Sequence, residues 1–94
     1  MTSKERRKYP RVPIRWPASL LTADGKISGE TGDISLEGAF VHCRQLLRQN
    51  DTILLTIRAP HGYLKVVAEV VWTAVSSGQE HQNVSGVGLH FLWV

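Results

Sequence analysis

The chain has 94 residues and a mass of 10.5 kDa, which is enough for a single domain with one small hydrophobic core. Hydrophobic residues make up 43% of the chain and charged residues 20%, and this composition excludes a disordered tail. The single cysteine excludes an intramolecular disulfide, no apolar run is long enough to span a bilayer, and the N-terminus does not resemble a secretory signal. We therefore expect a cytoplasmic protein with no membrane span.

Residues 1–13 form a basic N-terminal arm. Six of the eleven Lys and Arg residues lie among the first fifteen positions, where only Glu5 opposes them. Pro10 and Pro13 disfavour a helix here, so we expect an extended arm that is flexible without a ligand. Such an arm attracts nucleic acid, nucleotides or acidic lipid headgroups, and a simple solvated terminus is the alternative interpretation.

The remaining chain, residues 14–94, is expected to form a single all-β domain. Its first half has the pattern of β-strands. Residues 14–20 alternate with a period of two, which is typical of a β-strand, and Asp24-Gly25 is typical of a tight hairpin turn. A weaker strand is expected over residues 26–34 and a short one over residues 39–43. Residues 44–49 are the only segment with a helical pattern, long enough for one or two turns.

The second half also has alternating segments that are typical of strands joined by turns. Residues 52–58 alternate, residues 59–62 form a turn, and residues 64–72 are the clearest strand. Residues 76–83 resemble a linker, and residues 86–93 form the last expected strand. Six short strands joined by turns indicate an all-β fold, either an antiparallel sandwich or a closed barrel that would remove exposed sheet edges.

Catalytic signatures are weak. The four histidines have no metal-ligand spacing, and one cysteine cannot build a zinc cluster. Gly86-Val87-Gly88 lacks the third glycine of a dinucleotide-binding motif, so we interpret it as a place of close strand packing. His90 is expected on the outside of the barrel. We expect no enzymatic activity, no metal and no cofactor.

Two clusters remain as candidate binding residues. Arg7 and Arg11 lie four residues apart before the first strand, with Arg6 immediately ahead, and an arginine fork can hold phosphate oxygens, grip a guanine edge or stack on a purine.

The second cluster is the segment from Asp33 to Gly38, at the end of the second expected strand. The carboxylate of Asp33 can accept hydrogen bonds from N1–H and N2–H₂ of a guanine, and the Ser35 hydroxyl can donate or accept beside it. Gly38 permits a positive φ where the chain reverses. The alternative interpretation is an ordinary Asx-type turn between two strands.

Together the two clusters resemble the motifs of the PilZ domain family. The matching features are RxxxR at Arg7 and Arg11, [D/N]xSxxG at Asp33, Ser35 and Gly38, and a last strand that reads GVGLHF. The resemblance covers nearly the whole chain. It implies a six-stranded antiparallel β-barrel of the split-barrel type with at most a short helical turn, and it implies binding of the bacterial second messenger cyclic di-GMP (c-di-GMP).

The resemblance also implies a role for each motif residue. The two arginines of RxxxR would engage guanine and phosphate, Asp33 and Ser35 would hold a guanine edge, and Gly38 would shape the turn beneath it. An arginine directly before RxxxR, here Arg6, accompanies binding of a stacked nucleotide dimer in this family, which implies two ligand molecules per domain. The ligand would order the arm across the barrel and so alter contacts with an unidentified partner protein or attached domain.

Two other functions stay open. One is a PilZ-like protein-interaction domain that binds no nucleotide. The other is an oligonucleotide-binding barrel, which needs aromatic platforms for base stacking. We assign Trp16, Trp72 and Trp93 to the core because they fall on the apolar alternating faces, and we therefore do not expect a nucleic-acid polymer as partner.

Overall fold

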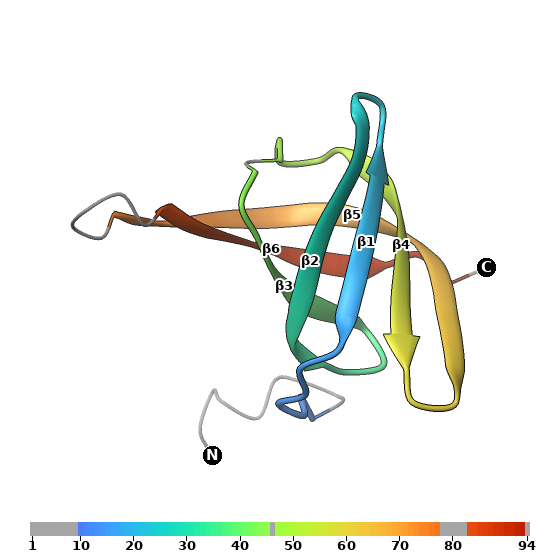
Figure 1. The fold of residues 1–94 in the computed structure, drawn as a ribbon. Coiled ribbons are helices and arrows are strands. Elements are labelled where there is room, and N and C mark those ends of the chain that lie inside the picture. Colours follow the sequence, from blue (N-terminus) through green and yellow to red (C-terminus); the bar gives the residue numbers. More distant parts are fainter. Residues whose placement is uncertain (1–9, 46, 78–82, 94) are drawn as a thin grey trace, which may run out of the picture.

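The computed structural model describes residues 10–45, 47–77 and 83–93. Six antiparallel strands close into a barrel in the order β1-β2-β3-β6-β5-β4 (Figure 1). The strands are β1 (Pro17–Thr22), β2 (Gly25–Ile34), β3 (Gly38–Cys43), β4 (Thr52–Ala59), β5 (Gly62–Ser77) and β6 (Asn83–Phe91). The expected all-β, six-stranded antiparallel barrel is therefore confirmed. The described residues contain no helix that could cross a membrane.

Glycines close two of the tight hairpins at the expected places. Gly25, the first residue of β2, has a φ of 129°, and Gly62, the first residue of β5, has a φ of 151°. These values lie in the region that a side chain disfavours, which explains why glycine follows Asp24 and His61. The two turns fix the register of both hairpins, with Leu20 opposite Ile27 and Ile57 opposite Leu64.

Alternate side chains of the strands fill the barrel. The largest fully buried apolar side chains are Leu20, Val41, Leu55, Ile57, Val70 and Val87. Each of them occupies one face of its strand, and full burial of an aliphatic side chain of this size contributes about 1.5–3 kcal/mol. The hydrophobic alternation of the sequence thus produces one core that is enclosed by all six strands.

A bulge in β5 changes which side chains face the core. Val70 pairs with Leu89, but Trp72 pairs with Gly88, so the register shifts by one residue between them. The shift turns the Trp72 side chain outward, where it is 41% exposed. The prediction that Trp72 belongs to the core is therefore wrong.

The other two tryptophans also lie outside the centre of the core. Trp93 is 56% exposed because β6 ends at Phe91, two residues earlier than expected. Trp16 is partly buried and packs against the core from a position just before β1, which begins at Pro17 and not at residue 14.

Two further segments differ from expectation. In the described part of residues 44–49 the chain forms bends and a turn instead of a helix, because Leu47 is buried against the core and the amide of Asn50 donates to the Val70 carbonyl at 2.7 Å. Both ends of the expected linker over residues 76–83 belong to strands, since Ser76 and Ser77 of β5 pair with Val84 and Asn83 of β6, and residues 78–82 lie outside the described residues. The paired ends of β5 and β6 project well beyond the barrel (Figure 1).

Candidate functional site

The N-terminal segment meets the end of β2 at one corner of the barrel. The amide of Val12 donates to the carbonyl of Ile34 at 2.8 Å, and the amide of Ile34 donates to the carbonyl of Val12 at 3.0 Å. This isolated antiparallel bridge brings Arg11 beside Asp33, with 3.5 Å between Nη1 and Oδ1. We call the region formed by Arg11 and residues 33–38 the arginine–aspartate corner.

A buried threonine fixes the chain that leads to this corner. Thr31 is fully buried, its hydroxyl donates to the carbonyl of Ile14, and the same oxygen accepts from the amide of Trp16 at 2.9 Å. The amide of Thr31 also donates to the carbonyl of Trp16 at 2.8 Å. These bonds attach residues 14–16 to β2, and the sequence analysis missed this role of Thr31. The only signal was a polar residue at a position that alternation assigns to the core.

The carboxylate of Asp33 has one oxygen that is shielded from solvent. Its Oδ1 receives no hydrogen bond from the described residues. Arg11 Nη1, at 3.5 Å, attracts this oxygen by charge but lies too far away for a well-formed hydrogen bond. The side chain as a whole is 29% exposed, so the corner is open to a ligand. A shielded acceptor without a donor is unfavourable by itself, and a ligand with N–H groups would satisfy it.

The turn after β2 is stabilised by Ser35. Its hydroxyl oxygen accepts from the amide of Glu37 at 3.1 Å, and its own amide donates to the carbonyl of Gly38 at 2.8 Å. The side chain that caps this turn is therefore that of Ser35, whereas the alternative interpretation from the sequence assigned an Asx-type turn. Because Ser35 accepts through oxygen, its hydroxyl proton can still be donated to a bound molecule.

Gly38 is required for close packing. The expectation of a positive φ at Gly38 is wrong, since only Gly25 and Gly62 have such a φ among the described glycines. A Cβ at Gly38 would instead lie 1.9 Å from the carbonyl oxygen of Leu89 on the paired strand β6. The start of β3 thus approaches β6 more closely than any side chain permits.

The structure brings together four of the six residues that the sequence singled out. Arg11 contacts Asp33, and Ser35 and Gly38 lie in the turn that follows. Arg6 and Arg7 lie outside the described residues. The indole N–H of Trp93 donates to the carbonyl of Leu36 at 2.7 Å, and no pattern in the sequence predicts this contact between residue 93 and the corner.

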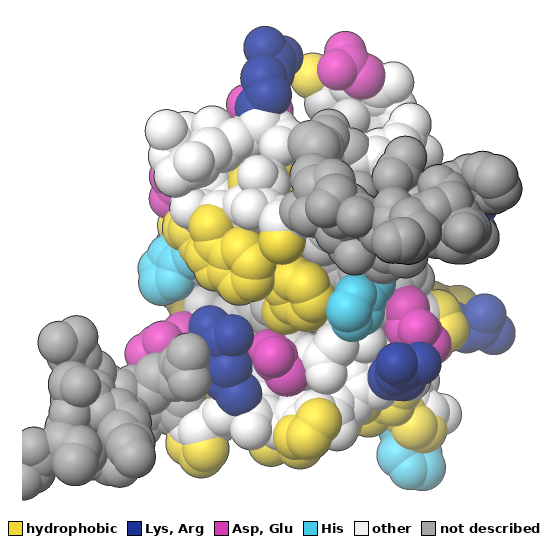
Figure 2. All heavy atoms as spheres, turned by 90° about the vertical axis from the view of Figure 1, so that its left-hand side faces the viewer, with side chains coloured by type: hydrophobic (Ala, Val, Ile, Leu, Met, Phe, Trp, Pro, Cys, Tyr) yellow, Lys and Arg dark blue, Asp and Glu magenta, His cyan; other side chains and the backbone are white. Residues whose placement is uncertain are grey.

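An aromatic cluster lies on the outer surface beside the corner. Phe40, which pairs with Asp33, stacks on Trp72 with a centroid distance of 5.3 Å and an interplanar angle of 14°. The rings lie over Gly86 and Gly88, where an added Cβ would come within 2.2 Å of them. These two glycines therefore permit close packing of aromatic rings on the sheet, whereas the sequence predicted close packing of strands. Hydrophobic side chains gather at the centre of the face seen in Figure 2, with acidic and basic side chains side by side below them.

The described residues offer no obvious centre for metal or thiol chemistry. No three His, Cys, Asp or Glu side chains among them lie close enough to hold a metal ion. Burial raises the pKa of the Cys43 thiol, and a backbone hydrogen bond at Gln45 lowers this pKa by less than burial raises it. The thiol is therefore protonated at neutral pH, and a protonated thiol is a poor nucleophile.

A family model for the PilZ domain matches residues 5–93 of this sequence. The chain belongs to the PilZ domain family. A search of curated proteins finds no match to it. This PilZ domain does resemble solved structures. One is the PilZ domain with c-di-GMP of YcgR from Escherichia coli, which is 16% identical with a TM-score of 0.78 over 94% of this chain and 79% of that one.

Two longer proteins contain a similar fold. The K. pneumonia MrkH–c-di-GMP complex is 17% identical with a TM-score of 0.75, over 95% of this chain and 45% of that one. The inhibitor of motility MotI/DgrA from Bacillus subtilis is 17% identical with a TM-score of 0.77, over 96% of this chain and 44% of that one. This PilZ domain thus spans less than half the length of either protein, and at these identities the likeness establishes a shared fold.

Proposed function

We propose that this PilZ domain is a receptor module for c-di-GMP, which binds at the arginine–aspartate corner. The observation that carries the proposal is the shielded Oδ1 of Asp33, which lies 3.5 Å from Arg11 and accepts no hydrogen bond from the described residues. The family assignment supports it, as do the YcgR and MrkH structures, whose names include c-di-GMP.

The chemistry of guanine fits this corner. A guanine edge presents two adjacent donors, N1–H and N2–H₂, and an ionised carboxylate accepts both. Binding would move Asp33 from a long ion pair to two charge-assisted hydrogen bonds, and it would free Arg11 to engage a phosphate or stack on a base. The hydroxyl of Ser35 would donate to the same nucleotide.

The arm would complete the site. Arg7 precedes Arg11 by four residues, so its Cα cannot be more than about 14 Å from that of Arg11, well within reach of a bound dinucleotide. We propose that Arg6 and Arg7 hold the phosphates and a second, stacked ligand molecule. The attraction between the cationic arm and the dianionic ligand would offset the entropy lost on ordering the arm. The reordered surface would then alter contacts with a partner protein or attached domain.

Calorimetric titration of the 94-residue chain with c-di-GMP and with cyclic di-AMP tests the proposal. Adenine presents an acceptor at N1 and lacks the N2 amine, so it leaves the carboxylate of Asp33 without its two donors. We expect c-di-GMP to bind at least roughly tenfold more tightly, with two molecules per chain. Equal affinities would contradict recognition of the guanine edge. No binding of c-di-GMP would favour the protein-interaction domain without a nucleotide.

The exposed Phe40–Trp72 stack favours a second candidate, the binding of single-stranded nucleic acid. The sequence argument against this function placed Trp72 in the core, and that placement is wrong. Two stacked rings, one of them on the strand beside Asp33, form a short platform for bases, and the basic residues of the N-terminal sequence would attract the phosphates. A titration with a short oligonucleotide, followed by tryptophan fluorescence at two salt concentrations, tests it. Strongly salt-dependent quenching without a response to c-di-GMP would establish this function in place of the first.

A further inference from the structure

The outer face of β5 has a symmetric pattern. Val66 and Ala68 point into the core, and the residues that point outward on either side of them are Tyr63, Lys65, Val67, Glu69 and Val71. Val67 stands at the centre, a base and an acid stand two residues to either side, and an apolar residue stands at each end. A second copy of this strand, rotated by 180° about an axis through Val67 and perpendicular to the strand, would place its base opposite the acid of the first copy and its acid opposite the base.

An apolar row crosses this strand at its centre. Leu21 of β1 pairs with Leu54 of β4, Leu54 pairs with Val67, and the amide of Leu92 donates to the carbonyl of Val67 at 2.8 Å. Leu21, Val67 and Leu92 are 48%, 43% and 38% exposed, and Leu54 is half-buried. Four aliphatic side chains, three from β1, β4 and β5 and one from the residue that follows β6, therefore form one continuous strip on the outside of the barrel.

The two charges beside this strip have no partner within the described part of the chain. Neither Lys65 nor Glu69 takes part in an ion pair there. They also cannot pair with each other, since four residues of extended strand separate them by about 13 Å. Each charge lies about 7 Å from Val67, on opposite sides of the apolar row.

We propose that this face is the contact between two copies of the chain. A twofold axis along the apolar row places Val67 against Val67 of the second copy and brings Lys65 over Glu69 in both directions. The other in-plane twofold, along the strand, would place Lys65 over Lys65 and is disfavoured by repulsion. An isologous contact requires self-complementarity of this kind. The inference goes beyond the proposed nucleotide site and does not depend on it.

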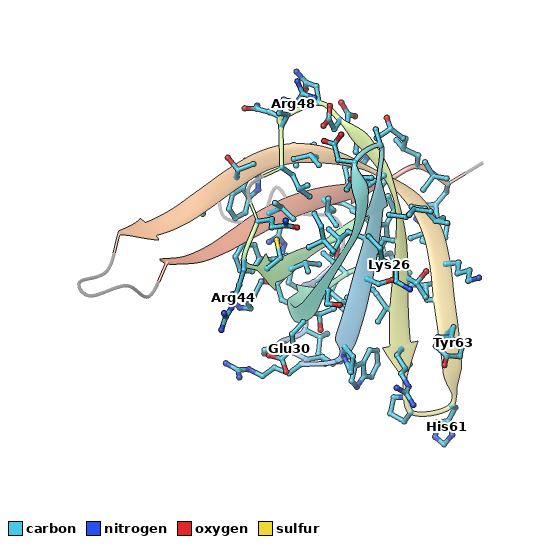
Figure 3. The ribbon with its side chains drawn as sticks, turned by 45° about the horizontal axis from the view of Figure 1, so that its top comes forward. Lys26, Glu30, Arg44, Arg48, His61 and Tyr63 are labelled. Atoms are coloured by element: carbon cyan, nitrogen blue, oxygen red, sulfur yellow. The ribbon has the colours of Figure 1, made fainter. Side chains whose placement is uncertain are left out.

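The shape of β5 limits the size of the contact. The strand curves strongly around the barrel, so its two ends fall away from a flat partner (Figure 1). Tyr63, labelled in Figure 3, extends from the end of this strand at the β4–β5 turn and forms the rim. A contact of one apolar row flanked by two ion pairs per dimer is small, so we expect weak, concentration-dependent association.

Sedimentation velocity of the full chain without nucleotide, from about 10 µM to about 1 mM, measures this association. We expect a monomer–dimer equilibrium that Lys65→Glu and Glu69→Lys each weaken by roughly tenfold or more, because each leaves like charges facing across the axis. The double variant should recover dimerisation. An equimolar mixture of the two single variants should form heterodimers, because one partner then carries two acids and the other two bases.

Matched controls separate this contact from general surface effects. Val67→Glu should abolish dimerisation, whereas Leu36→Glu, which adds the same charge at a leucine 63% exposed in the β2–β3 turn, should not. Circular dichroism of each variant checks that it is folded, which we expect because all substituted side chains lie on the surface. A chain that is monomeric at about 1 mM, or a double variant that fails to recover association, would overturn the proposal.

Discussion

The barrel has an arginine–aspartate ion pair at each end, and the two pairs are built differently. Arg48 and Asp51 are three residues apart at the end that carries the β1–β2 hairpin, their side chains are 83% and 46% exposed, and 3.8 Å separates their charged atoms. Arg11 and Asp33 are far apart in sequence and 36% and 29% exposed. Figure 3 shows Arg48 on the surface, well away from Tyr63 at the opposite end.

The same contrast holds for two threonines. The hydroxyl of Thr22, at the far end, donates to Gly25 at 2.9 Å and accepts from Asp24 at 3.0 Å, and these bonds are exposed and local. The hydroxyl of Thr31 makes the same kind of bridge, but its bonds are part-buried and its partners, Trp16 and Ile14, lie 15 and 17 residues away in sequence. The same residue types thus have different consequences. Thr31 and the Arg11–Asp33 pair join segments that are far apart in sequence and are less exposed, whereas Thr22 and the Arg48–Asp51 pair make local, exposed contacts.

The largest effect is expected from glycine substitutions at the two ends. Gly38→Ala would place Cβ 1.9 Å from a backbone oxygen of β6, which cannot move without breaking the sheet. We expect the free energy of unfolding in urea to fall by about 3 kcal/mol or more. Gly25→Ala has open space and suffers only from its φ of 129°, so we expect a loss of about 1 kcal/mol. Equal losses would show that the close β3–β6 approach does not matter.

Substitutions in the two ion pairs should have different effects on the affinity for c-di-GMP. Arg11→Ala or Asp33→Ala should weaken c-di-GMP binding roughly ten- to hundredfold, since each removes a bidentate contact of about 1–3 kcal/mol. The matched variants Arg48→Ala and Asp51→Ala should leave the affinity unchanged. Calorimetry on folded proteins measures both sets. Near-native affinity in both corner variants would refute the assignment of the site.

Substitutions of the two threonines should lower the free energy of unfolding by different amounts. Thr31→Val leaves the carbonyl of Ile14 and the amide of Trp16 without their buried partner, and we expect the free energy of unfolding to fall by about 1–2 kcal/mol. In Thr22→Val the amide of Asp24 and the carbonyl of Gly25 can bond to water instead, so the free energy of unfolding should fall by about 0.5 kcal/mol or less. Hydrogen exchange at the Trp16 amide should accelerate only in the first variant. An unchanged exchange rate there would contradict the anchoring role of Thr31.

Much of the fold could be predicted from the sequence because its signals are local. Alternation identifies the strands, and Asp24-Gly25 and Gly62 identify two turns. Trp72 was misplaced because a one-residue bulge reverses the faces of a strand, and nothing in the residues around Val70 indicates a bulge. The helical pattern after β3 failed because the buried Leu47 side chain, a tertiary contact, decides the path of the chain.

The candidate site could be predicted only as a set of residues. The motif resemblance names Arg11, Asp33, Ser35 and Gly38, and their function stays a prediction. The geometry that joins them depends on the Val12–Ile34 bridge and on Thr31, which act across the sheet and leave no local pattern. The reason for glycine at position 38 is a close contact with Leu89 of β6, which lies far away in the sequence. Such a contact can be identified only once the pairing of the strands is known.

Mapping of c-di-GMP binding by amide chemical shifts of the ¹⁵N-labelled chain tests the central claim most directly. We predict that the largest shifts occur at Arg11 and at residues 33–38, and that the amides of Asp24 and Asp51 at the far end stay in place. Large shifts at the far end, or at Phe40 and Trp72 alone with residues 33–38 unmoved, would contradict a guanine-binding corner at Asp33.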